Sequence, residues 1–481
     1  MHQPTLRDDQ IADLAFYMAN DRCLNLSDAG AGKTPSVCVM QWYLWSELRI
    51  GTVWAMPKSL LKKNRRELLR FTGFGDEDVV IVDGTPAEIA RQLGLPAKVF
   101  LMGFRRLTLS WRNLPAHVTA VHVDEMHMGY KGAGSQQSAA LFALFDSGRM
   151  THFLGMTGTL IDGKLSSAYP AVRIIDAGSY PSPQAFDDEH AVFDLDGRIA
   201  GWKNHNRLAR ILGRHAIRRS FASIHGEQEV VHIPEPVDME ERQRGLYDRF
   251  HHDAVLELER FTIDGTRPGV AFTRARQLME HPGAFPDLSA PGRFIDILEG
   301  EPTAKEERLK IHLEEHHLNG KPLIVFTSML PQQGRIARLL QQHGLTFALI
   351  SGGISRKARD AASDAFIDGR VQVMLATERT ASFGYNWQVS GGREVDHMIF
   401  ATLGFSDASF VQARQRAIRG RRKSPLRVTT LEYISSIDQH ICRIVHRKSL
   451  EAHRVDPSRP VLQLSGCNDA HHPAHATGDI P

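Results

Sequence analysis

Hydrophobic positions along the chain form short apolar runs that alternate with longer amphipathic stretches, and this alternation occurs twice. The first set of runs lies at 23–26, 52–56, 79–82, 99–102, 118–123 and 152–155. The second set lies at 323–326, 347–350, 371–376, 397–401 and 427–433. Strands of a parallel sheet that is covered on both faces are apolar throughout, and helix-length segments between them suit crossover connections. The pattern therefore predicts an α/β fold with two mostly parallel sheets, each flanked by helices.

The pattern changes between the two sets. Charged, amphipathic helices are expected at 207–218, 239–258 and 273–280, with breaks rich in Pro and Gly at 180–183 and 281–293. After residue 455 the composition turns to Pro, Ser, Gly, Asp and His. We therefore expect an N-terminal lobe over 1–165, a helical insertion and linker over 166–300, a C-terminal lobe over 301–455, and a flexible tail over 456–481.

Composition narrows the class of protein. The chain has 481 residues, 42% of them hydrophobic, which is enough for two or three buried cores. No apolar run is long enough to cross a bilayer, and the N-terminus does not resemble a signal peptide. The four cysteines lie far apart and form no C-x-x-C pair, which argues against a disulfide scaffold or a zinc ribbon. We expect a soluble intracellular protein, cytoplasmic, nucleoid-associated or nuclear according to the host, with no membrane partner.

A glycine-rich segment, Ser27-Asp28-Ala29-Gly30-Ala31-Gly32-Lys33-Thr34, follows the first apolar run and precedes a helical pattern. Gly30 and Gly32 would allow a tight turn whose backbone N–H groups point at phosphate oxygens. Lys33 would supply a positive charge for the β- and γ-phosphates, and Thr34 a hydroxyl for Mg²⁺. The usual motif begins with glycine where this chain has serine, so the match is to a relaxed form. An ordinary turn before a helix is the alternative interpretation.

A phosphate-binding loop needs a carboxylate that can reach the metal ion from the other side, and a pair of acidic residues at a strand end can supply it. The apolar run 118–123 ends in Asp124-Glu125-Met126-His127. Carboxylates at the end of a buried strand are costly unless a metal or hydrogen bonds use them. We expect Asp124 to hold Mg²⁺ and Glu125 to orient or deprotonate the attacking water. The loop and the carboxylates together predict hydrolysis of a nucleoside triphosphate.

The second α/β set has no phosphate loop of its own, but it carries an arginine pair. Arg416 and Arg419 lie three residues apart, so we expect them to share one face of a helix. Guanidinium groups can bind a γ-phosphate and stabilise transition-state charge, as an arginine finger does. An exposed, solvated helix face is the alternative.

Motifs along nearly the whole chain resemble the core of superfamily-two helicases, most closely the Swi/Snf-related branch with its DEAH-type box. In chain order they are Leu6-Arg7-Asp8-Asp9-Gln10, the phosphate loop, Pro57-Lys58-Ser59-Leu60-Leu61, Asp124-Glu125-Met126-His127, Thr157-Gly158-Thr159, Arg276-Gln277 with His281-Pro282, Phe326-Thr327-Ser328, Ser382-Phe383-Gly384-Tyr385-Asn386, and Gln412 with Arg416 and Arg419. Two departures are Met126, where the box usually has alanine, and Asn64, where the branch often has tryptophan.

The resemblance implies two RecA-like lobes that clamp one ATP with Mg²⁺. It also implies that Gln10 reads adenine, and that DNA rather than RNA is the track, because that branch works on duplex DNA. The expected partner is DNA, duplex or single-stranded, and a separately encoded protein is a possible further partner. The expected nucleotide-binding residues are Gln10, Asp28, Gly30, Gly32, Lys33, Thr34, Asp124, Gly384 and Gln412, with Thr34 and Asp124 as metal ligands and Lys33, Glu125, Arg416 and Arg419 as catalytic residues.

Other functions compete with an ATP-driven DNA helicase or translocase. A helicase directed at RNA is one alternative, because the residues themselves do not decide between DNA and RNA. A P-loop phosphotransferase would not explain the late arginine pair or the second α/β set. A DNA-binding scaffold without hydrolysis would be expected to have lost Lys33, Glu125 or Arg419, and all three are present. The motor is therefore the favoured interpretation.

Overall fold

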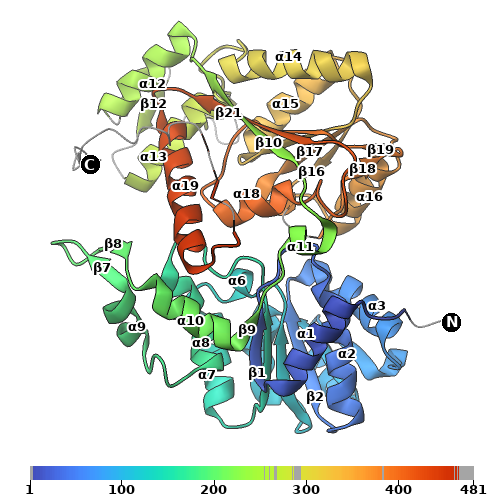
Figure 1. The fold of residues 1–481 in the computed structure, drawn as a ribbon. Coiled ribbons are helices and arrows are strands. Elements are labelled where there is room, and N and C mark those ends of the chain that lie inside the picture. The colour runs from blue at the N-terminus through green and yellow to red at the C-terminus, as the bar shows by residue number, and fades with distance from the viewer. Residues whose placement is uncertain are drawn as a thin grey trace. The chain divides into compact units, whose positions relative to one another are not determined.

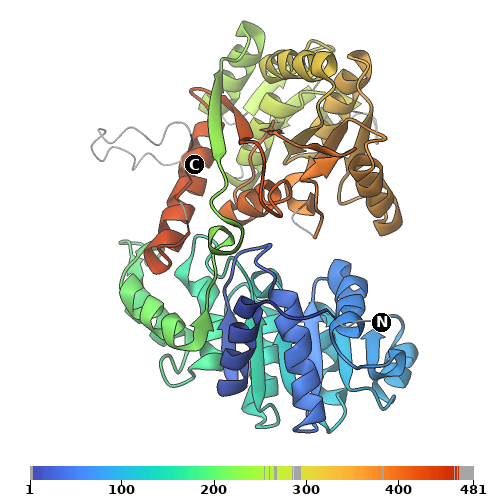
Figure 2. The ribbon, with the colours of Figure 1, turned by 45° about the vertical axis from the view of Figure 1, so that its right-hand side comes forward.

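The computed structural model describes residues 4–253, 255–258, 261–264, 268–283, 285–286, 294–381, 384–459, 461–462 and 464. The chain forms two compact units (Figures 1 and 2). The N-terminal unit contains Met1–Glu227 and Lys448–Val461, and the C-terminal unit contains Gln228–Arg447 and Leu462–Pro481. Each unit is built on its own parallel sheet, which confirms the predicted α/β class with two sheets flanked by helices.

The N-terminal sheet has seven parallel strands in the order β3-β4-β2-β5-β6-β1-β9. Its strands are β1 (Arg22–Asn25), β2 (Gly51–Met56), β3 (Val79–Val82), β4 (Val99–Gly103), β5 (Val118–Val123), β6 (His152–Met156) and β9 (Ala216–Ile217). The predicted apolar runs match the first six of these strands to within one residue at each end. These strands can be located from the sequence, because a strand covered on both faces has no polar face to interrupt its apolar run.

Helices cover both faces of this sheet. One face carries α1 (Asp8–Ala19), α2 (Lys33–Ser46) and α3 (Leu61–Phe71). The opposite face carries α4 (Pro86–Leu93), α5 (Phe104–Ser110), α7 (Gln136–Asp146), α8 (Tyr169–Ile175) and α10 (His205–His215). Successive residues of β2 alternate between the two cores: Val53 and Ala55 join the second, Trp54 and Met56 the first. This alternation is the two-residue period of a strand.

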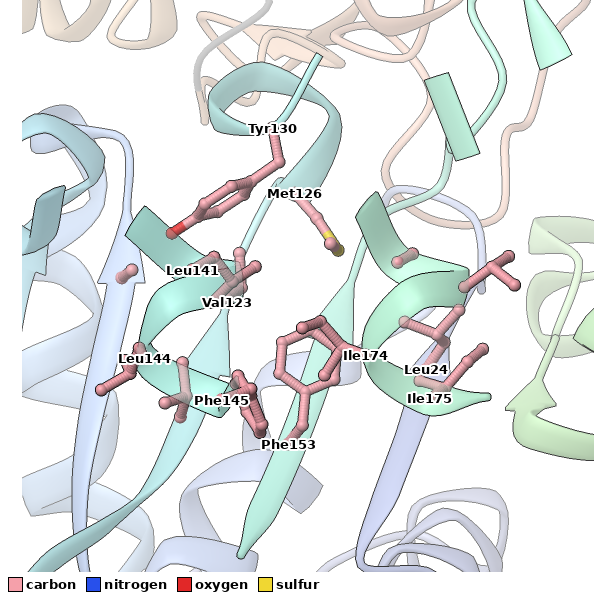
Figure 3. Packing of buried hydrophobic residues seen from close by; sticks show 14 of the residues in the cluster. Leu24, Val123, Met126, Tyr130, Leu141, Leu144, Phe145, Phe153, Ile174 and Ile175 are labelled. Atoms are coloured by element: carbon pink, nitrogen blue, oxygen red, sulfur yellow. The ribbon is translucent and has the colours of Figure 1, made fainter. Parts of the chain in front are cut away.

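The larger of these cores is shown in Figure 3. Strand residues such as Val123 and Phe153 meet Leu141 from α7 and Ile174 from α8. Met126, which follows the acidic pair of the DEAH-type box, is only 1% exposed and belongs to this core. Its side chain therefore packs among apolar residues, so methionine in place of alanine changes the packing rather than the polar groups of the box.

The C-terminal sheet has six parallel strands in the order β10-β21-β20-β15-β17-β16. They are β10 (Val230–Val237), β15 (Leu323–Thr327), β16 (Phe347–Ile350), β17 (Val373–Thr377), β20 (His397–Phe400) and β21 (Leu426–Tyr433). The helices of this unit include α12 (Glu241–Asp253), α13 (Pro268–Glu280), α14 (Ala304–Asn319), α15 (Leu330–Gln342), α16 (Arg356–Ile367), α17 (Glu378–Ala381) and α18 (Asp407–Arg414). Long α19 (Ile437–Val455) contains the point at which the chain passes between the units.

The region between the two sheets contains strands as well as helices. The helix predicted over 239–258 ends at Asp253, and Val255–Leu258 then pairs with Phe261–Asp264 as the hairpin β11–β12. The helix predicted over 207–218 ends at His215, because β9 follows and pairs with β1. Before it lies a second hairpin, β7 (Ala191–Phe193) with β8 (Ile199–Trp202), preceded by α9 (Pro183–His190).

This middle region is shared between the units rather than forming one insertion. Residues up to Glu227 belong to the N-terminal unit, because Leu208, Ile211 and Leu212 of α10 complete its larger core. Helices α12 and α13 pack instead with Tyr433 at the end of β21. Of the predicted tail, residues 456–459 form a hydrogen-bonded turn after α19, and most of 460–481 lies outside the described residues.

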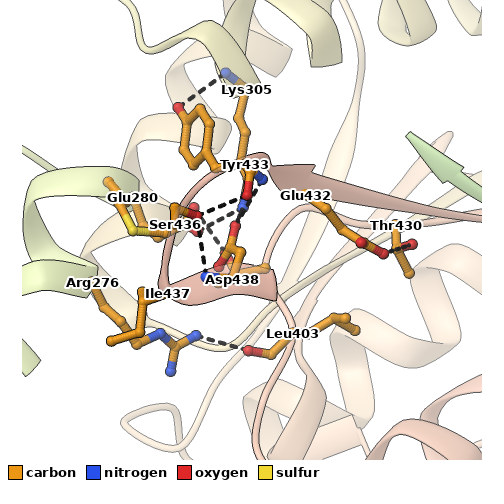
Figure 4. A network of polar contacts seen from close by, with 12 residues as sticks. Arg276, Glu280, Lys305, Leu403, Thr430, Glu432, Tyr433, Ser436, Ile437 and Asp438 are labelled. Atoms are coloured by element: carbon orange, nitrogen blue, oxygen red, sulfur yellow. Dashed lines mark hydrogen bonds and ion pairs between the residues drawn. The ribbon is translucent and has the colours of Figure 1, made fainter. Parts of the chain in front are cut away.

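A buried ionic cluster joins helices of the C-terminal unit (Figure 4). The Lys305 Nζ of α14 lies 2.7 Å from a Glu280 oxygen of α13 and 2.6 Å from an Asp438 oxygen of α19. Tyr433 packs its ring 4.8 Å from the same ammonium group. Buried charges of this kind need complete pairing, because one stranded charge would destabilise the fold strongly. The cluster therefore fixes α13 and α19 against α14.

A second buried carboxyl group, Glu378, predicts a pH-dependent stability. One of its oxygens accepts the Gly404 N–H at 2.8 Å, and the other has no hydrogen-bond partner among the described residues. Burial raises its pKa to about 7 from an ordinary value of 4.5. The folded state therefore holds this proton more tightly than the unfolded state, so its contribution to stability declines as pH rises from about 4.5 to about 7. At about 1.4 kcal/mol per pKa unit, the decline amounts to roughly 3 kcal/mol.

Replacing Glu378 with glutamine should remove that decline, because the amide stays neutral at every pH. We expect the urea midpoint of the wild-type C-terminal unit to fall further between pH 5 and pH 8 than the midpoint of Glu378→Gln. Hydrogen exchange of peptides from β17 and β20, which lie in the same unit, reports the transition. Glu307→Gln, at a partly exposed glutamate of α14, is the matched control. An equal fall in wild type and Glu378→Gln would contradict the assignment.

Candidate nucleotide site

Three loops meet at the carboxyl edge of the N-terminal sheet. Strands β5, β6 and β1 are consecutive in the sheet, and each continues into a motif that the sequence analysis selected. β1 leads to the phosphate loop, β5 to Asp124 and Glu125, and β6 to Thr157-Gly158-Thr159. In open parallel sheets ligands bind outside the carboxyl ends of the strands. The fold thus brings together three segments that are far apart in the sequence.

The phosphate loop has the backbone geometry that its glycines predict. Gly30 and Gly32 have φ of 86° and 83°, in the left-handed region. A Cβ on Gly32 would lie 2.8 Å from the Arg7 guanidinium and 3.0 Å from the Gln10 amide, so a larger residue would be strained by the positive φ and would displace these side chains. The Lys33 ammonium donates to the carbonyls of Ser27 and Asp28 at 2.6 and 3.0 Å. The lysine is therefore held across its own loop at the N-terminus of α2.

Helix α1 holds the phosphate loop from outside. Gln10 is 4% exposed, and its Nε2 donates to the Gly32 carbonyl at 2.9 Å while its Oε1 accepts from the Arg7 N–H. Arg7 in turn donates to the Ala31 carbonyl at 3.0 Å. Gln10 thus lies against the loop, next to the expected nucleotide site, and its reading of adenine stays a prediction.

Asp124 lies half-buried at the end of β5. Its Oδ2 accepts from Asn64 Nδ2 at 3.0 Å, and its Oδ1 accepts the Glu125 backbone N–H at 3.0 Å. Burial, followed by the neighbouring charge of Glu125, raises the pKa of the Asp124 carboxyl, while Asn64, Lys33 and Lys63 lower it. A divalent cation would favour the ionised form further.

Asn64 is a site residue that sequence analysis missed. It replaces the tryptophan common in the Swi/Snf-related branch and is 2% exposed, among the buried residues Leu61, Asn64 and Leu68 of α3. A polar residue on the apolar stripe of a helix was the available signal, because buried polar groups are nearly always hydrogen-bonded. Its neighbours Lys62, Lys63, Arg65 and Arg66 give the segment the composition of a solvated helix face, which hides this signal.

The second carboxylate begins a tight turn. Glu125 has φ 50° and ψ 52°, an uncommon conformation for a residue with a side chain, and it precedes the short helix α6 (Met126–Gly129). Such backbone strain gathers at functional sites. The Glu125 carboxylate lies 3.6 Å from the His127 ring, and the His127 Nδ1 lies 2.7 Å from the Thr157 hydroxyl. Burial lowers the pKa of His127 to about 4, so the imidazole is neutral near pH 7 and links the acidic box to the β6 loop.

These residues fit a nucleoside triphosphate with Mg²⁺. The glycines leave the backbone open, Lys33 supplies a positive charge, and Asp124 supplies a half-buried carboxylate of the type that Mg²⁺ prefers. Gly158 completes the arrangement, because a Cβ there would lie 3.3 Å from the Ser27 carbonyl. The β6 loop therefore packs directly on the phosphate loop.

The arginine pair lies in the C-terminal unit, and its predicted placement on a helix face is wrong. Helix α18 ends at Arg414, so Arg416 and Arg419 belong to the turn that follows. After the helix the backbone continues in tighter turns, in which the N–H groups of Arg416, Ala417 and Ile418 donate to carbonyls three residues earlier. Gln388 Oε1 then accepts the backbone N–H groups of Arg419 and Gly420 at 2.8 and 2.9 Å, so neither group continues the helical pattern. Both guanidinium groups nevertheless donate to one atom, the Tyr385 carbonyl oxygen, at 3.1 and 3.2 Å. The two side chains converge as expected, by a different backbone route.

The other predicted residues of this unit lie around that turn. Gln412 is buried in α18, and its carbonyl accepts from Arg416 Nε at 2.9 Å. Gly384 is exposed with φ 72°, next to Tyr385, whereas Ser382 and Phe383 lie outside the described residues. The structure thus assembles one set of predicted residues in the N-terminal unit and a second set, Gly384, Gln412, Arg416 and Arg419, in the C-terminal unit.

Comparison with known proteins gives an independent view. Residues 304–421 match the family model described as helicase conserved C-terminal domain. The ATP-dependent RNA helicase dbp3 of Aspergillus terreus is 28% identical over 163 residues, which cover 32% of this chain and 30% of that protein. The chain therefore matches less than a third of that relative's length. The solved SWI2/SNF2 ATPase core of Sulfolobus solfataricus in complex with dsDNA is similar at 17% identity with a TM-score of 0.42, covering 96% of this chain and 98% of that chain.

Among the helices that the structure describes, none combines the length and the apolar composition needed to cross a bilayer.

Proposed function

We propose that this chain, whose resemblance to superfamily-two helicases is confirmed by the helicase C-terminal domain in residues 304–421, is an ATP-driven motor on duplex DNA. The observation that carries the proposal is the arrangement of the N-terminal unit. There the phosphate loop, the Asp124–Glu125 pair and the Thr157 loop occupy one edge of one sheet. That arrangement supports hydrolysis of a nucleoside triphosphate, and the helicase domain supports a motor.

In the proposed reaction each residue of the N-terminal unit has a defined task. Backbone N–H groups of the loop and the Lys33 ammonium bind the phosphates, and Thr34 and Asp124 hold Mg²⁺, which neutralises phosphate charge when bound. Glu125 orients the attacking water and accepts its proton. The hydrogen bond between His127 and Thr157 connects the segment of Asp124 and Glu125 to the loop after β6, so a nucleotide-dependent movement of one segment would be passed to the other.

The C-terminal unit supplies the arginines in this proposal. Arg416 is 2% exposed and donates to two carbonyls, so it anchors the turn. Arg419, which is more accessible, is the residue that we assign to transition-state charge. ATP binding then favours closure of the two units on one nucleotide, and hydrolysis favours reopening, which produces movement along the nucleic acid.

Duplex DNA is proposed as the track because the motifs resemble the Swi/Snf-related branch. Lys62, Lys63 and Arg66 are exposed on α3, the helix that also contributes Asn64 to the nucleotide site, and they could contact backbone phosphates. RNA is the second candidate, favoured by the similarity to a protein named as an RNA helicase.

The test is phosphate release from ATP without nucleic acid and with single-stranded DNA, duplex DNA or RNA. We expect duplex DNA to raise the rate most, and the apparent affinity to fall steeply with salt, because phosphate contacts release counterions. Stimulation by RNA alone would move the assignment to an RNA helicase. A rate that ignored all three nucleic acids would contradict the motor. Displacement of a third strand from a triplex would then separate translocation from unwinding.

A further inference from the structure

The segment that leaves the N-terminal unit lies directly against the start of the phosphate loop. Strand β9 pairs with β1, and the Leu26 N–H donates to the Ile217 carbonyl at 2.8 Å. The Asp28 N–H donates to the Arg219 carbonyl at 3.0 Å, and the Arg219 N–H donates to the Ser27 hydroxyl at 3.0 Å. The loop thus continues the pairing of the two strands through its first two residues.

The Asp28 side chain strengthens this attachment. Its Oδ2 accepts the Phe221 N–H at 2.9 Å, and its Oδ1 lies 3.5 Å from an Arg218 guanidinium nitrogen. The carbonyls of Ser27 and Asp28 are the groups that hold the Lys33 ammonium. Arg218 is therefore separated from the phosphate-binding lysine by one residue, Asp28.

Arg218 has a second set of partners on the other side. Its guanidinium pairs with Asp456, and its Nε donates to the Ser458 hydroxyl at 2.7 Å. Asp456 begins the turn that follows α19, and one of its oxygens accepts from the Ser458 hydroxyl at 2.8 Å. The side chains of Arg218, Asp28 and Asp456 are 19–25% exposed, so the three charges are screened less than surface ions would be.

The triad of Asp28, Arg218 and Asp456 lies close to both places where the chain passes between the units. The chain passes between the units after Glu227 and again within α19, between Arg447 and Lys448. Arg218 lies nine residues before the first passage, and its partner Asp456 immediately follows α19, which contains the second. One guanidinium group thus contacts the phosphate loop together with both connecting segments.

We propose that Arg218 is a positioning residue for ATP turnover, which acts on Lys33 through Asp28 and couples the phosphate loop to the connections between the units through Asp456. The inference rests on the proposed function. It deepens that function by naming the residues through which ATP binding at the phosphate loop would affect the segments that connect the units. It also explains the relaxed start of the loop. Ser27 and Asp28 occupy positions at which their side chains bind the segment 217–221.

The test compares wild type with Arg218→Ala, Arg218→Lys and Asp456→Asn. Steady-state hydrolysis gives KM for ATP, kcat, and the ratio of rates with and without duplex DNA. Arg218→Ala should raise KM and lower the stimulation ratio, each by about tenfold, within the usual range of coupling between sites. Arg218→Lys keeps the charge and should restore part of both. Asp456→Asn should lower mainly the stimulation ratio, because Asp28 keeps its guanidinium partner.

Arg214→Ala is the matched control, since Arg214 is an exposed arginine of α10 with no carboxylate within 4.0 Å among the described residues. A purely structural role would lower the melting temperature while KM and the stimulation ratio stayed at wild-type values, and that result would overturn the inference. If Arg218→Ala does not fold, Arg218→Lys and Asp456→Asn still decide the question. Wild type without any hydrolysis would overturn the proposed function itself, whereas stimulated wild type with unchanged variants would overturn only the inference.

Discussion

Arg419→Ala is expected to abolish nearly all stimulated ATP hydrolysis while the protein stays folded. An arginine that stabilises the negative charge of the transition state raises kcat for phosphoryl transfer by about 10³- to 10⁵-fold. We therefore expect kcat to fall by at least about 10³-fold. The fold should tolerate the change, because the turn is held by backbone bonds that the substitution keeps, including the Arg419 N–H that donates to Gln388 Oε1 at 2.8 Å.

Controls separate this catalytic effect from general damage. Arg370→Ala removes an exposed arginine of the same unit, paired only with nearby Asp368 among the described residues, and should leave kcat at the wild-type value. Arg419→Lys retains the charge but loses the planar guanidinium, so it should recover only a small part of the rate. A rate within twofold of wild type for Arg419→Ala, with normal melting, would remove Arg419 from the proposed site.

Glu125→Gln is expected to bind ATP and to turn it over about 10²- to 10⁴-fold more slowly, which is the usual contribution of a general base. The substitution keeps the size and the hydrogen-bonding oxygen of the side chain. It should also keep the turn at φ 50°, because glutamine and glutamate have similar backbone preferences. Asp124 and Lys33 remain in place, so affinity for a fluorescent ATP analogue should change by less than a few fold.

The matched control for this variant is Glu88→Gln in α4, an exposed N3 residue of a capping box that the fold places outside the site. Its hydrolysis rate should equal that of wild type. If Glu125→Gln hydrolysed ATP at the wild-type rate, another group would have to activate the water. If it lost ATP binding as well, Glu125 would have a role in holding the loop rather than in chemistry.

Much of this architecture could be predicted from the apolar pattern. Buried parallel strands are continuous apolar runs, so β3 and β5 and most other strands could be located closely. The glycines at 30 and 32 likewise predicted a tight turn, and both adopt positive φ in the structure. Local sequence carries this information, because each feature depends on neighbouring residues only.

Features that depend on distant contacts could not be predicted in the same way. Arg416 and Arg419 have helical spacing, yet they lie in a turn beyond the helix, where Gln388, about thirty residues earlier, accepts the backbone N–H groups of Arg419 and Gly420. Asn64 contacts Asp124 across sixty positions. The attachment of residues 217–221 to the phosphate loop joins segments more than 190 positions apart. No local pattern encodes these pairings.

The central claim is that ATP draws the two units together on one nucleotide, and interdomain energy transfer tests it most directly. Dyes can be placed on Leu109→Cys in the N-terminal unit and Leu318→Cys in the C-terminal unit, which are 66% and 85% exposed. Cys23, Cys38 and Cys442 are buried and should react slowly, and Cys467→Ser removes the remaining thiol. In a Glu125→Gln background, we expect the transfer efficiency with ATP and Mg²⁺ to differ clearly from that with ADP, and the difference to disappear in Arg419→Ala. Equal efficiency in ATP and ADP, with both nucleotides shown to be bound, would contradict the claim.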